Sequence, residues 1–126
     1  MKKGNSAEAY LESILTLHRE KGYARSVDIA KDLGVTKPTV CGAMKRLREK
    51  RMIKFGEKGC ILFTEAGKVI AERAYKRHTM LAKALIGIGV NKANAAKEAC
   101  NIEHAISDET YECLNDFFRA HLVISD

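Results

Sequence analysis

The first third of the chain alternates apolar and polar positions with the period of amphipathic helices. Between residues 6 and 21, apolar residues and one histidine recur at three- and four-residue spacings. They are Ala7, Tyr10, Leu11, Ile14, Leu17 and His18. Ser26 and Thr36 are expected to cap two more helices, and Gly34 is expected to end the first of these two. Two short helices joined by a tight glycine turn predict a helix-turn-helix.

The pattern then becomes strand-like and returns to a helical period. Four apolar residues, Ile53, Phe55, Ile61 and Phe63, flank a glycine-bearing turn over 56–59 and predict a two-stranded ribbon. Thr64 is expected to begin a long helix that reaches the glycines near residue 88, followed by helices over 93–106 and from Ser107 onward. The fold class is therefore mainly α, with a winged helix-turn-helix over 1–72 followed by an all-helical domain over 73–126.

Composition and charge limit the function classes. The 126 residues suffice for one domain or two very small ones, and no apolar run is long enough for a bilayer span. Four cysteines without a paired spacing, in a chain without an export signal, predict reduced thiols in a cytoplasmic protein that does not bind membranes. Residues 1–73 carry sixteen basic and nine acidic side chains, whereas 74–126 carry six and seven. The basic half is therefore expected to bind a polyanion.

The outer face of the helix that follows Thr36 is the candidate DNA-reading surface. A helix-turn-helix places its second helix in the major groove, and a wing can reach the flanking phosphates. The candidate DNA-binding residues are Thr36, Lys37, Pro38, Thr39, Cys41, Lys45, Arg46, Arg48 and, on the wing, Lys58. Without Asn or Gln on this face, apolar and shape contacts are expected to outweigh base-edge hydrogen bonds. The alternative is a charged face that is merely solvated.

A possible metal site lies in the second half. Cys100, Glu103 and His104 are three and four residues apart, so a helix places a thiol, a carboxylate and an imidazole on one face. His78 lies on the apolar stripe of the preceding helix and could face them, and Glu12 offers a further carboxylate. The alternative is a buried core cysteine and histidine without a metal. A thiolate favours Fe(II), Zn(II) or Co(II) over Mn(II), which prefers oxygen ligands.

Several segments of the chain resemble the diphtheria-toxin-repressor and manganese-transport-regulator family of metal-activated transcriptional repressors. The matching segments are 7–14 (AEAYLESI), 35–40 (VTKPTV), 62–67 (LFTEAG), 77–78 (RH), 98–104 (EACNIEH) and 107–108 (SD). The resemblance covers nearly the whole chain, and the segment 98–104 is its most specific part.

The resemblance implies that 1–72 is a DNA-binding domain and that 73–126 is a dimerisation and metal-binding domain. It also implies a homodimer that binds a palindromic operator in double-stranded DNA when a divalent ion is bound. Fe(II) is the expected ion, with Mn(II), Zn(II) and Co(II) as alternatives. The residues that carry over as metal ligands are Glu12, His78, Cys100, Glu103 and His104. Ala9 stands where the family places an Asp or Met ligand, and Ala82 and Ala96 replace the Glu and His of a second metal site. The C-terminal SH3-like domain of longer members is not expected here.

Two functions are alternatives to that of a metal-dependent repressor. The first is a winged-helix regulator that is independent of metal or responds to oxidation of Cys41, Cys60 or Cys100. The second is a small metalloenzyme in which Glu103 is a general base. The chain has neither a His-Glu-x-x-His motif nor a glycine-rich phosphate loop, so we expect no enzyme activity.

Overall fold

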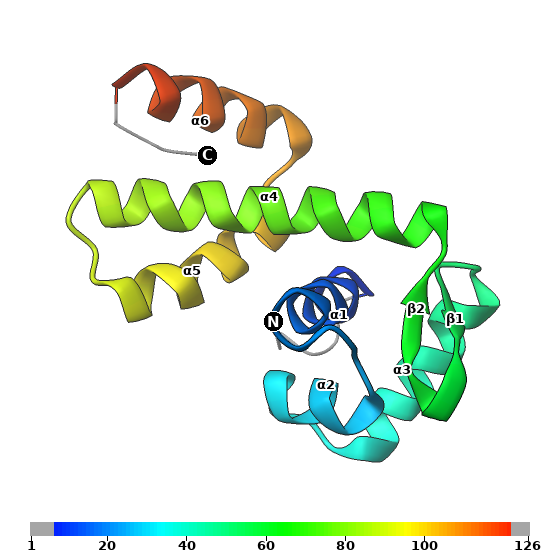
Figure 1. Ribbon diagram of the computed structural model, residues 1–126. Helices are drawn as coiled ribbons and strands as arrows, with labels where there is room; N and C mark the ends of the chain where they lie inside the picture. The colour runs from blue at the N-terminus through cyan, green and yellow to red at the C-terminus, as the bar shows by residue number, and fades with distance from the viewer. Residues whose placement is uncertain (1–6, 122–126) are drawn as a thin grey trace. The chain divides into compact units, whose positions relative to one another are not determined.

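The computed structural model describes residues 7–121 (Figure 1). The chain divides into two compact units, Met1–Ala74 and Tyr75–Asp126. The helix α4 (Glu65–Gly87) contributes residues to both units. No helix among the described residues is long and apolar enough to cross a membrane.

The first unit begins with the three helices that the apolar pattern predicts. They are α1 (Ala7–Lys21), α2 (Ser26–Leu33) and α3 (Lys37–Glu49), and Ser6, the expected first residue, lies outside the described part. Gly34 ends α2 in a left-handed conformation (φ 68°), and its N–H donates to the carbonyl of Ala30. Thr36 caps α3 by accepting a 3.3 Å hydrogen bond from the N–H of Thr39. The helix-turn-helix is therefore present.

The expected cap of α2 is wrong. The helix begins at Ser26 itself, and Arg25 occupies the N-cap position without a side-chain hydrogen bond. Ser26 already has helical geometry, so its hydroxyl is not placed to accept from the first free N–H groups.

The core of the first unit joins all of its elements. Its largest fully buried side chains come from the three helices and both strands: Leu11, Ile14, Ile29, Val40, Met44, Ile53 and Ile61. A partly buried polar contact also links α1 to α2, because the Ser13 hydroxyl donates a 2.7 Å hydrogen bond to Asp32. The three-helix packing fixes which face of α3 remains exposed.

The wing is a two-stranded antiparallel sheet. Strand β1 (Ile53–Phe55) pairs with β2 (Ile61–Phe63), with Ile53 opposite Phe63. The turn between them contains a 3₁₀ segment, Glu57–Gly59, in which Lys58 (φ 57°) is left-handed. The N–H of Ile61 donates to the Ala24 carbonyl at 2.8 Å, so β2 is also fixed to the segment that links α1 to α2.

The start of α4 lies against the segment between α3 and the wing. Thr64 caps α4 by accepting from the N–H of Gly67 at 3.1 Å, and its hydroxyl donates to the Arg51 carbonyl at 2.7 Å. The backbone of Gly67 is so close to Met52 that a Cβ at position 67 would overlap the Met52 carbonyl oxygen. Only glycine fits here without moving the backbone.

The second unit contains the rest of α4 together with α5 (Lys92–Ala105) and α6 (Asp108–His121). The side chains of Asn91 and Ser107 cap α5 and α6, each by accepting from the backbone N–H three residues later. The apolar core consists of Met80, Leu81, Ala84 and Ala99, and against it pack Ala82, Leu85, Ile102, Tyr111, Leu114 and Phe118. The four core residues belong to α4 and α5, and α6 supplies three of the residues that pack against them.

Candidate metal centre and DNA-binding surface

Three of the five predicted metal ligands converge within the second unit. One donor atom each from His78, Cys100 and Glu103 lies within 4.8 Å of the other two. The Glu103 carboxylate oxygen Oε1 is 3.7 Å from His78 Nδ1, too far for a hydrogen bond. Two donors that bind one ion at about 2.1 Å lie roughly 3 to 4 Å apart, so this separation suits shared coordination.

The convergence follows from helix packing. Ala99 is completely buried against Met80, Leu81 and Ala84, so α5 lies directly on α4. Cys100 follows Ala99 on α5, and His78 lies one turn before Leu81 on α4. The 3.6-residue period then places Glu103 one turn beyond Cys100 on the same face.

Burial supports a cation at this position. Cys100 and Glu103 are only 3% and 6% exposed. A carboxylate removed from water to this extent is costly to keep ionised, and a bound cation would offset that cost. Thiolate, imidazole and carboxylate together form a donor set that binds divalent transition metals, so the residues present fit the expected ion.

The other two predicted ligands lie at different places. His104 borders the cluster, since its Nε2 is 3.9 Å from the same Glu103 oxygen and its side chain is 6% exposed. Glu12 lies on α1 in the first unit. Ala9, on the same helix, is buried, and its side chain has no donor atom. Ligation by each of the five residues remains a prediction.

Arg77 connects α4 to α6 beside the cluster, a contact that spacing alone does not predict. Its buried guanidinium donates a 3.0 Å hydrogen bond to the Asp108 carboxylate and lies over the Tyr111 ring, 4.7 Å from the centroid. Burial raises the pKa of Tyr111, and the charge of Glu112 raises it further. The first turn of α6 is thereby held next to the helix that carries His78.

The candidate DNA-binding residues lie on the exposed side of the first unit. The opposite side of α3 is buried through Val40, Ala43, Met44 and Leu47. All eight candidates in the segment 36–48 are exposed, and so is Lys58 in the wing turn. The surface therefore combines four cationic side chains on α3 with one on the wing, which suits a phosphate backbone.

Phe55 also belongs to this surface, although no sequence pattern placed it there. The Arg48 guanidinium lies over the Phe55 ring at 5.4 Å from its centroid, so it is supported by the first strand of the wing. Arg48 and Phe55 are seven residues apart in the sequence, and their side chains meet only because the ribbon folds against α3.

Known families match nearly the whole chain. Residues 3–59 match the family described as iron dependent repressor, N-terminal DNA binding domain. Residues 64–121 match the family described as iron dependent repressor, metal binding and dimerisation domain.

Individual relatives agree with this assignment. The transcriptional regulator MntR of Escherichia coli O157:H7 is 35% identical over 112 residues, which are 89% of this chain and 72% of that protein. The regulator MntR of Geobacillus thermodenitrificans is 34% identical over 111 residues, 88% of this chain and 79% of that protein.

A solved structure extends the agreement to the fold. The crystal structure of T. acidophilum IdeR is 30% identical and superimposes with a TM-score of 0.79 over 90% of this chain. This chain spans about half of that protein, 54% of its length. The chain belongs to the iron-dependent repressor family of metal-responsive transcriptional regulators, which are DNA-binding proteins and not enzymes.

Proposed function

We propose that this chain is a metal-dependent repressor that binds operator DNA as a homodimer. The observation that carries the proposal is the convergence of His78, Cys100 and Glu103 within 4.8 Å in the unit that matches a metal-binding and dimerisation domain. The first unit supplies the exposed basic helix α3 and the wing.

The proposed ion is Fe(II). The Cys100 thiolate favours Fe(II), Zn(II) or Co(II), whereas Mn(II) prefers sites with more oxygen ligands. His104 is proposed as a fourth ligand because it borders Glu103, and Glu12 as a fifth because the resemblance to the family assigns it that role. The ion supplies positive charge and fixed directions for its ligands.

The proposed mechanism relies on the side chains that hold α4, α5 and α6 of the second unit together. Glu103 is buried, and an ionised carboxylate at this position would weaken the packing of α5 on α4 if no cation were close to it. Charge neutralisation at Glu103 therefore stabilises the α4–α5 pair, and Arg77 extends that order to the first turn of α6. Such ordering favours one arrangement of a dimer, and with it one spacing of the two α3 helices along a palindromic operator.

Metal-dependent DNA binding is the direct test. We expect Fe(II), under anaerobic conditions, to increase the affinity of the full chain for its operator at least about tenfold, within the usual 5- to 150-fold range of coupling between two sites. Fluorescence anisotropy of labelled operator DNA, titrated with and without Fe(II), Mn(II), Zn(II) and Co(II), measures the change. Equal affinity with and without every ion would contradict the proposal and favour a metal-independent regulator.

Salt dependence tests the assignment of α3 as the phosphate-binding helix. The affinity should fall steeply with salt, with a slope that corresponds to roughly six to ten neutralised phosphates per dimer. Arg46→Met removes one cation per protomer, so the slope should decrease by about 2 per dimer. Lys97→Met on α5 makes the same change of charge in the other unit and should leave the slope unaltered. Equal decreases for both variants would show a non-specific charge effect.

A further inference from the structure

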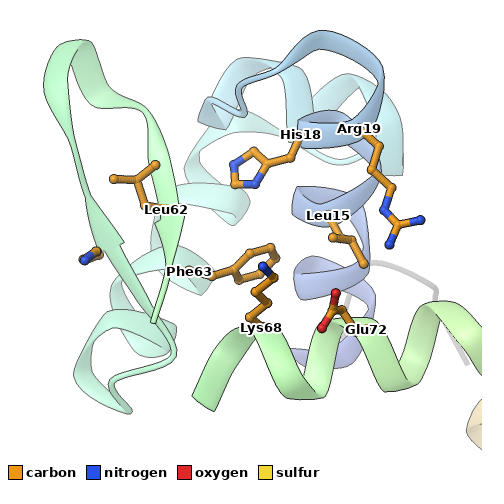
Figure 2. A pocket seen from close by; sticks show the side chains of 8 residues that line it. Leu15, His18, Arg19, Leu62, Phe63, Lys68 and Glu72 are labelled. Carbon is orange, nitrogen blue, oxygen red and sulfur yellow. The ribbon is translucent and has the colours of Figure 1, made fainter. Parts of the chain in front are cut away.

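The first unit contains a cleft that neither the metal site nor the DNA-binding surface uses. It has a volume of about 500 Å³, which is within the usual range for sites that bind small molecules. Figure 2 shows its walls: Leu15, His18 and Arg19 come from α1, Leu62 and Phe63 from β2, and Lys68 and Glu72 from α4. Lys54 of β1 completes the lining.

One part of the cleft is an apolar and aromatic wall. Leu15 is buried, and the His18 and Phe63 rings are half-buried and meet edge to face, with centroids 5.4 Å apart. His18 Nε2 is 2.8 Å from the Ile61 carbonyl oxygen. Since a carbonyl can only accept, this nitrogen carries the hydrogen and the imidazole is fixed in orientation. A flat apolar group would find a preformed surface here.

The other part of the cleft is cationic. Arg19, Lys54 and Lys68 contribute three positive charges, and Glu72 contributes one negative charge. All four side chains are exposed, as is Leu62, whereas Leu15, His18 and Phe63 are buried or half-buried. The charged groups therefore form the rim, and these three residues form the floor. An excess of positive charge around a concave apolar surface favours a ligand that combines an anionic group with a hydrophobic body.

We propose that this cleft binds a small aromatic carboxylate. The ring would pack against Leu15, His18 and Phe63, and the carboxylate would lie among the cationic side chains of the rim. A DNA phosphate could interact with the cationic rim, but a phosphodiester has no apolar group to pack against Leu15, His18 and Phe63. Since α1, the wing and α4 all line the cleft, a bound ligand would also stabilise the wing against the helices.

The experiment uses the full chain without added metal or DNA, so its result does not depend on the proposed repressor function. 1-Naphthoate is titrated into the ¹⁵N-labelled protein, and amide chemical shifts are followed by NMR. We expect saturable binding at one site in the millimolar range or tighter, with the largest shifts at residues that line the cleft. Naphthalene-1-methanol, which keeps the rings and lacks the charge, should bind at least about tenfold more weakly.

Two charge variants make the test specific. Lys68→Gln should weaken naphthoate binding about three- to tenfold, whereas Lys31→Gln, an equally exposed lysine on α2 outside the cleft, should change it less than twofold. Circular dichroism checks that both variants keep their helical content. Equal weakening by both variants, equal affinity for acid and alcohol, or shifts located only on α3 would each overturn the proposal, the last in favour of a simple anion effect on the DNA-binding face.

Discussion

Replacing Cys100 by serine is expected to lower the affinity of the chain for Co(II) at least about 100-fold, because changes that only support a ligand already cost about 10- to 100-fold. The thiolate is the softest donor of the cluster and is only 3% exposed, so no solvent molecule can take its place with equal affinity. The thiolate-to-Co(II) charge-transfer absorption in the near ultraviolet should disappear at the same time.

Cys113→Ser is the matched control for this prediction, since Cys113 is exposed on α6. It should leave both the affinity and the absorption band unchanged. Glu103→Gln adds a second variant with nearly the same shape, and it should weaken Co(II) binding while the band of the remaining complex persists. If Cys100→Ser instead lowered only the stability of the protein and left metal binding intact, a packed core cysteine would be the better interpretation.

Gly67→Ala is expected to lower the free energy of unfolding by at least about 2 kcal/mol, since forcing an extra carbon into a packed site costs typically 1–3 kcal/mol. The added Cβ would overlap the carbonyl oxygen of Met52, which is backbone and cannot rotate away. The start of α4 would have to move from the segment between α3 and the wing. Urea denaturation monitored by circular dichroism measures the loss.

Gly42→Ala provides the comparison for a glycine within a helix. A Cβ at position 42 would meet only the end of the Arg46 side chain, at 3.5 Å. Alanine is favoured over glycine inside a helix, so this variant should be stabilised by roughly 0.5–1 kcal/mol. Similar losses for both variants would show that the close approach to Met52 does not determine the effect.

Periodicity predicted the helices and the wing because the apolar positions are regular in those segments. Spacing also placed Cys100, Glu103 and His104 on one helical face without any knowledge of the tertiary fold. The position of His78 depended on how α4 and α5 pack, and sequence spacing could only suggest it. Packing is decided by small residues such as Ala99, whose complete burial has no clear signal in the sequence.

Other features depend on contacts between distant segments and could not be predicted. Nothing in the local sequence indicates that Gly67 touches Met52, or that the His18 ring is hydrogen-bonded to Ile61 on the wing. The wrong cap at Ser26 has a local cause, because a helix can begin one residue earlier than its best capping side chain suggests.

The position of Arg48 over the Phe55 ring has a consequence for the entropy of DNA binding. A free arginine loses up to about 2 kcal/mol of side-chain conformational entropy when it is fixed against a phosphate. The stacked guanidinium has already lost part of that freedom when the protein folds, so less is lost when DNA arrives. In the proposed repressor, Phe55 would thus contribute to affinity without touching the nucleic acid.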